Sequence, residues 1–139
     1  MALSRSQKIL KILLGSFLLF AGISHLTWNR AEFLAQVPSW VPMNEDLVVL
    51  LSGIVEIALG SSLIFLKGQK GALAGTATAL FFIAIFPGNI HQYVNGISAF
   101  GLDSDRARLI RLFFQPVLVL WALWSSGAWK YWSERRASR

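Results

Sequence analysis

The stretch LVVLLSGIVEIALGSSLIFL, residues 47–66, decides the fold, because it is long and apolar and carries one charged side chain, Glu56. A helix rises about 1.5 Å per residue, so about 20 such residues cross the hydrocarbon core of a bilayer. Three further stretches share this length and character, at about Ile9–Leu26, Ala72–Ile90 and Leu109–Ala128. With Leu47–Leu66 they predict an all-α, integral membrane four-helix bundle that forms one domain over residues 1–139.

The composition of the whole chain agrees with a membrane protein. Of 139 residues, 55% are hydrophobic and 14% are charged, and the mean hydropathy is +0.54. Cysteine is absent, which excludes disulfides, thiolate metal sites and iron–sulfur clusters built by this chain alone. The net charge of +6 could indicate nucleic-acid binding, but the basic residues flank apolar segments. Anionic lipid headgroups are therefore the expected partner, and we expect no nucleic acid.

The distribution of basic residues predicts an orientation. Four spans put both termini and the connection between spans two and three on one side of the membrane. That side carries nine of the 13 basic residues: Arg5, Lys8, Lys11, Lys67, Lys70, Lys130, Arg135, Arg136 and Arg139. Because cytoplasmic flanks accumulate Lys and Arg, we expect both termini in the cytoplasm and the loops 28–46 and 91–108 outside. We expect the first span to be retained rather than cleaved as a signal peptide. For residues 29–37 two interpretations remain open, a short interfacial helix that begins near Asn29 or an irregular surface loop.

Small or polar residues recur at helical spacing in the spans, so these faces should point into the bundle. They are Gly15, Leu18, Gly22 and His25 in span one, Gly53, Glu56 and Gly60 in span two, and Arg111, Gln115, Leu118, Ala122 and Ser125 in span four. In span three, Gly71 and Gly75 would let a neighbouring backbone come close within the bundle. Because hydrophobic association is weak in lipid, this close packing is how such a bundle holds together.

The depth of the polar side chains indicates a pocket. Counted from the outer end of each span, all of them except Lys11 fall in the outer half of the membrane, and Lys11 is expected to snorkel to the inner surface. The candidate ligand-binding residues are Glu56, Arg111, Gln115, Asn89, His25 and His91. We therefore predict a polar pocket that opens to the outer face.

Glu56 is the residue that most needs a partner, because a carboxylate near the bilayer centre costs free energy unless it is protonated or paired. We expect Arg111 to reach it, with Gln115 one turn deeper on the same face. Two interpretations remain open. The pair could fix how spans two and four pack, or Glu56 could accept a proton or orient a ligand.

Histidines and prolines complete the predicted pocket. His25 and His91 could ligate haem or a metal, but two histidines without cysteine make a thin ligand set, so we expect no intrinsic metal or cofactor. Pro87 and Pro116 each lack a backbone donor, which should free the carbonyls of Ile83 and Leu112 and kink both helices. We expect Asn89 and Gln115 to donate to the freed carbonyls. Pro87 with Gly88 is also expected to end span three.

At these residues the chain resembles the DoxX family of small four-helix bacterial membrane proteins. The matching stretches are GISHL at 22–26, SGIVEIALG at 52–60, FPGNI at 86–90 and RLFFQPVLVLWALW at 111–124. The resemblance highlights His25, Glu56, Pro87, Asn89, Arg111 and Gln115. Two departures are Gly88, where the family more often has Ala, and Phe113, where it often has Pro, so the position of the kink in span four is in doubt. The resemblance implies a protein of the bacterial inner membrane.

Three functions are compatible with this pattern. The first is a subunit of a redox system that binds quinone or another amphiphilic small molecule in the outer pocket, with electrons supplied by a partner. The second is a non-enzymatic assembly factor or accessory subunit for another membrane protein, or a homo-oligomer. The third, which an outer pocket alone disfavours, is a small proton-coupled transporter. No nucleophile motif or triad spacing supports a stand-alone enzyme.

Overall fold

The computed structural model describes residues 2–27, 31, 34, 37–97, 102 and 104–138. Within these ranges the elements are all helical: α1 (Arg5–Leu26), α3 (Glu45–Phe65), α4 (Gly68–Val94), α5 (Asp105–Ser125) and α6 (Ala128–Ala137). The first four are long and apolar enough to cross a membrane, so the prediction of an all-helical protein with four helices of spanning length is confirmed. The segment 29–37, interpreted as a short helix or a loop, lies mostly outside the described residues.

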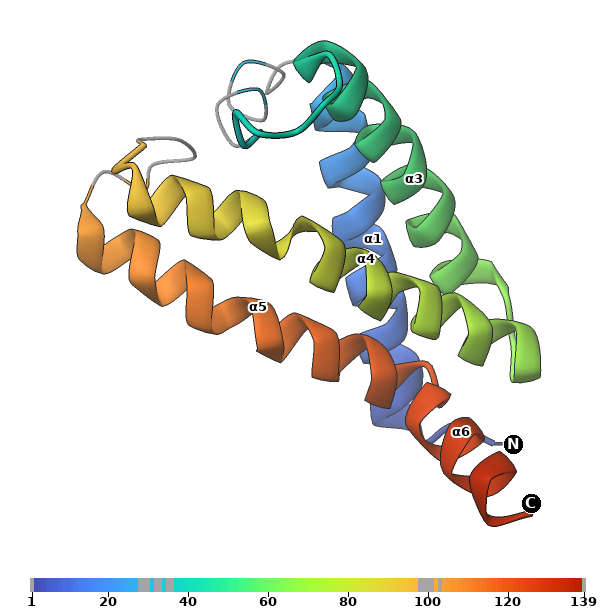
Figure 1. The fold of residues 1–139 in the computed structure, drawn as a ribbon. Coiled ribbons are helices and arrows are strands. Elements are labelled where there is room, and N and C mark those ends of the chain that lie inside the picture. Colours follow the sequence, from blue (N-terminus) through green and yellow to red (C-terminus); the bar gives the residue numbers. More distant parts are fainter. Residues whose placement is uncertain are drawn as a thin grey trace.

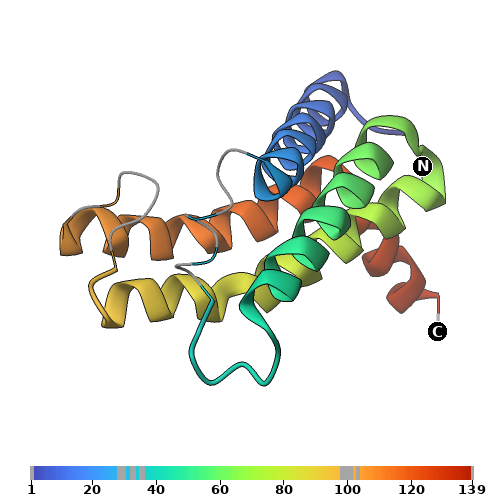
Figure 2. The ribbon, with the colours of Figure 1, turned by 90° about the horizontal axis from the view of Figure 1, so that it is seen from above.

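The spans form two antiparallel pairs, α1 with α3 and α4 with α5 (Figure 1). The pairs meet near the end of the molecule where the N- and C-termini lie, which we call the terminal end. They diverge toward the opposite end, the loop end, as the view from above also shows (Figure 2). The core fills the region where the pairs meet, with Leu14, Leu18, Leu63, Phe82 and Ala122 all buried. The arrangement is therefore wedge-shaped rather than a bundle of even width.

Glycines hold α1 against α3. A Cβ atom added to Gly22 would lie 2.7 Å from the Gly53 carbonyl oxygen, and one added to Gly60 would lie 2.6 Å from the Gly15 carbonyl oxygen. Only glycine permits backbones to approach this closely, which increases the dispersion contacts along both helices. All four glycines are buried, as the predicted inward faces of spans one and two require.

The pairing of α4 with α5 uses a similar contact at the terminal end. A Cβ atom added to Gly75 would overlap the Ser126 side chain and lie 2.9 Å from the Ala122 carbonyl oxygen. The prediction that Gly75 packs within the bundle is therefore confirmed. The turn that follows α5 is fixed by Gly127, whose φ of 79° lies in the left-handed region that favours glycine.

Two predicted helix ends are wrong. Helix α4 continues through Pro87 and Gly88 to Val94, whereas the sequence analysis ended span three at Ile90 and expected the proline to break it. A proline removes one hydrogen bond, but ending a helix in lipid would leave several backbone groups without partners. Span four, predicted to reach Ala128, ends instead at Ser125, and Ala128 begins α6.

Helix α6 turns back onto α4. The Trp132 indole donates to the Thr76 hydroxyl over 2.8 Å, and the Gln69 amide donates to the Tyr131 hydroxyl over 3.1 Å. Helix α6, which carries Tyr131 and Trp132, is therefore docked on α4.

Lys11 corrects another expectation, because it does not snorkel. Its side chain is 5% exposed, and its Nζ donates to the Leu66 carbonyl over 2.7 Å. Leu66 caps the C-terminus of α3, where carbonyl groups lack helical partners and the helix dipole attracts a cation. An acceptor within reach inside the protein replaces the water that snorkelling would have provided.

Candidate functional site

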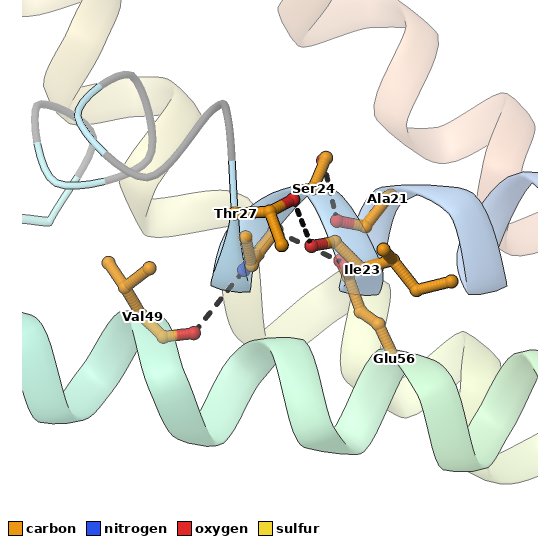
Figure 3. Close-up of polar contacts among 7 residues, drawn as sticks. Ala21, Ile23, Ser24, Thr27, Val49 and Glu56 are labelled. Carbon is orange, nitrogen blue, oxygen red and sulfur yellow. Dashed lines mark hydrogen bonds and ion pairs between the residues drawn. The ribbon is translucent and has the colours of Figure 1, made fainter.

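His25 and Glu56 form a buried pair between α1 and α3. His25 lies in the last turn of α1, and its Nδ1 is 3.4 Å from the Val49 carbonyl oxygen of α3. Its Nε2 is 3.2 Å from Oε2 of Glu56, and both side chains are less than a tenth exposed. Figure 3 shows Glu56 rising from α3 toward the last turns of α1, with the Val49 carbonyl further along α3 toward its N-terminus. The close approach at Gly53 makes this possible, since a Cβ added there would lie 2.9 Å from Cβ of His25.

Hydrogen-bond chemistry fixes the number of protons on this pair. A carbonyl oxygen only accepts, so we assign a proton to Nδ1 of His25. The contact of 3.2 Å between Nε2 and Glu56 Oε2 would be repulsive if both atoms presented lone pairs, so we infer one further proton on the pair. That proton resides either on the imidazole or on the carboxyl group. The pair is electrically neutral in both cases.

The expected pairing of Glu56 with Arg111 is wrong. Arg111 instead donates from Nη1 to Oε1 of Gln115 over 2.8 Å, and Nε2 of Gln115 donates to the Phe82 carbonyl of α4 over 2.6 Å. The reason is the arrangement of the helices, because α3 packs against α1 and α4 rather than α5. The Gln115 amide thus joins α5 to α4, but its acceptor is the Phe82 carbonyl, which is neither of the two carbonyls, Ile83 and Leu112, that the prolines were expected to free.

A cavity of about 690 Å³ lies between the two helix pairs on their diverging side. Its walls are mostly apolar, with contributions from Phe17, Leu18, Phe81, Ile85 and Leu118. Residues Val37, Pro38, Trp40, Val41 and Leu102, from the connections at the loop end, also line it. Volumes of about 300–1,000 Å³ with apolar walls and few polar groups are typical of small-molecule sites.

Four of the six predicted site residues line this cavity: His25, Glu56, Asn89 and Arg111. Gln115 does not line the cavity. It is 2% exposed, and its Oε1 accepts a hydrogen bond that orients the Arg111 guanidinium. The polar groups of the cavity therefore come from all four long helices, with Asn89 contributed by α4 and Arg111 by α5.

His91 is the predicted site residue that the structure places elsewhere. Because α4 remains helical beyond Pro87, His91 lies two residues past Asn89 and so on another face of the helix. Its Nδ1 is 3.1 Å from Nδ2 of Asn95, one turn further along α4. The expectation that His91 lines the pocket rested on a turn at Gly88 and is therefore wrong, whereas Asn89 does line the cavity.

Sequence reasoning missed Ser52, Pro38 and Trp40, which also line the cavity. Ser52 directly precedes the buried Gly53 in the sequence, and a polar residue in that place was the available signal. For Pro38 and Trp40 the signal was weak, since a connecting segment shows no periodicity. Among the described residues, no group of three His, Asp or Glu side chains is placed to hold a metal ion.

The four long apolar helices indicate a multi-pass membrane protein, with a mostly apolar cavity between two helix pairs. Comparison with protein families gives one match, over residues 14–126, to the family described as "Domain of unknown function (DUF8561)". The chain belongs to this family, and the match includes α3, α4, α5 and every predicted site residue. No curated protein and no solved structure matches the chain.

Proposed function

We propose that this protein binds an amphiphilic small molecule in the cavity between its two helix pairs. One observation carries the proposal: an apolar cavity of about 690 Å³ has a small set of polar groups, His25, Glu56, Asn89 and Arg111, in its wall. The apolar tail of the ligand would pack against the apolar wall residues, such as Phe17, Phe81 and Leu118, and displace solvent from them. The polar groups would orient the head of the ligand.

Quinone is one candidate ligand. Its carbonyls accept hydrogen bonds, which Arg111 and Asn89 can donate, and its reduction takes up protons, which the His25–Glu56 pair could relay. The electrons would have to come from a partner protein, so this chain would act as a subunit of a redox system. The chain would then have a binding role rather than catalyse a reaction alone.

The proposed setting is a bacterial inner membrane with both termini in the cytoplasm. The excess of Lys and Arg at the terminal end supports this orientation, and it would place the cavity toward the outer leaflet. The resemblance to DoxX proteins supports the same setting. We retain membership of a DoxX-like group as a proposal beside the DUF8561 match.

A second candidate is an accessory subunit or assembly factor for another membrane protein. The observation that favours it is that several polar side chains join helices to one another. His25 contacts the Val49 carbonyl, and Gln115 contacts the Phe82 carbonyl. Such contacts specify a fold whether or not a ligand binds.

Native mass spectrometry from mild detergent tests the proposal, with extraction and identification of any amphiphile that co-purifies. Ala21→Trp fills the cavity from α1, whereas Ala77→Trp adds the same side chain to an exposed position of α4. We expect a bound small molecule in the wild type and in Ala77→Trp, and its loss in Ala21→Trp. Equal retention by both variants would contradict binding in the cavity. A stoichiometric protein partner with no small molecule would favour the accessory role.

A further inference from the structure

The net charge of the cavity wall constrains the ligand, because an apolar cavity in a membrane tolerates an uncompensated charge poorly. Among the described residues that line the cavity, three side chains are titratable or charged: His25, Glu56 and Arg111. The His25–Glu56 pair is neutral with either placement of its shared proton. The guanidinium of Arg111 is always protonated. The described part of the wall therefore carries one net positive charge.

Within the part of the chain that the structure describes, no acidic group beside Arg111 neutralises that charge. No carboxylate oxygen among the described residues lies within 4.0 Å of its guanidinium. Its contacts are the neutral Oε1 of Gln115 at 2.8 Å and the ring of Phe114, whose centroid is 5.9 Å from the guanidinium carbon. Arginine presents five N–H donors, and the bond to Gln115 uses one of them. Gln115 holds the group in place and leaves donors for a ligand.

The neighbouring arginine of α5 shows the contrast. Arg108, one turn nearer the loop end, donates to the Leu102 carbonyl and to Oδ1 of Asp105, both over 2.9 Å. Its charge thus has an acidic partner on the same helix. Arg111 has no acidic partner among the described residues, although it lies deeper along α5 and lines the cavity.

We propose that the head group of the bound amphiphile is anionic, a carboxylate or a phosphate, and that Arg111 selects it by charge. This inference rests on the proposed function and narrows its ligand class. The anion would accept hydrogen bonds from the free donors of Arg111, and Asn89 could donate one more from α4. A single-chain acid or an anionic phospholipid would both supply this chemistry.

A binding comparison with matched amphiphiles tests the charge selection. Oleate, oleyl alcohol, phosphatidylglycerol, phosphatidylcholine and a short-chain ubiquinone are each added to purified protein in an uncharged detergent, and bound ligand is quantified by native mass spectrometry. We expect oleate to bind about 10- to 100-fold more tightly than oleyl alcohol, the range for a hydrogen-bonded charge. If oleate binds more tightly than oleyl alcohol, the anion is a single-chain acid. If phosphatidylglycerol binds more tightly than phosphatidylcholine, the anion is a phospholipid head group.

Variants of α5 assign the preference to Arg111. Arg111→Gln should remove the preference for the anion, Arg111→Lys should retain part of it, and Arg106→Gln, which removes an exposed charge from the same helix, should leave it unchanged. Oleyl alcohol or ubiquinone binding the wild type as tightly as the anions would overturn this inference and leave the proposed function standing. If no amphiphile bound the wild type, both would fail. An anion preference that survived in Arg111→Gln would also overturn the assignment.

Discussion

Gly60→Ala should loosen the α1–α3 pair by an amount that the structure allows us to estimate. The added Cβ would lie 2.6 Å from the Gly15 carbonyl oxygen and 2.7 Å from the Leu19 backbone nitrogen, whereas ordinary contact begins at 3.4 Å. Both obstacles are backbone atoms, so relief requires α1 to move away by about 0.8 Å. A gap of about 0.5–1 Å forfeits a quarter to a half of the dispersion energy of each contact it opens. We expect a loss of about 1–3 kcal/mol in the free energy of unfolding, the usual cost of overpacking.

Reversible unfolding in mixed micelles, followed by circular dichroism, measures this loss. Ala58→Val is the matched control, because it enlarges an exposed side chain on the same helix. We expect the control to unfold like the wild type. If Gly60→Ala were as stable as the control, the close approach of α1 and α3 would not be the contact that holds this pair together.

Four further changes probe three polar contacts by the same unfolding measurement. Gln115→Leu removes the bond to the Phe82 carbonyl and should cost about 1–3 kcal/mol; an unchanged stability would refute this link between α4 and α5. Lys11→Met removes the cation at the end of α3 and should cost a similar amount, whereas no loss would mean that the contact contributes nothing net. His25→Leu leaves Glu56 buried without its partner and should cost about 3–5 kcal/mol. Glu56→Gln can still donate to Nε2 of His25 and should be nearly neutral, and equal losses for the two would contradict the shared proton.

The sequence was sufficient for the spans and for the faces they bury, because both depend on local periodicity. Gly15, Gly22, Gly53 and Gly60 recur at helical spacing, and this spacing alone predicted the face on which they lie buried. Lipid makes such predictions firm, since a spanning segment must satisfy its backbone internally.

The partners of the polar groups could not be predicted in the same way. Glu56 was assigned to Arg111 by depth, but depth does not say which helices are neighbours, and α3 adjoins α1 and α4. The same limit applies to Lys11, whose acceptor is a carbonyl far away in the chain. His91 was misplaced for a different reason, because a proline in lipid interrupts a helix less readily than a proline in water.

Photoaffinity labelling tests the central claim, that the cavity binds an amphiphile, most directly. A photoreactive fatty acid is crosslinked to the protein in membranes, with and without excess oleate, and the labelled residues are mapped by mass spectrometry. The account predicts oleate-sensitive labels on cavity residues such as Phe17, Phe81 and Leu118. Labels confined to lipid-facing residues such as Ile83 and Leu120, and insensitive to oleate, would contradict it.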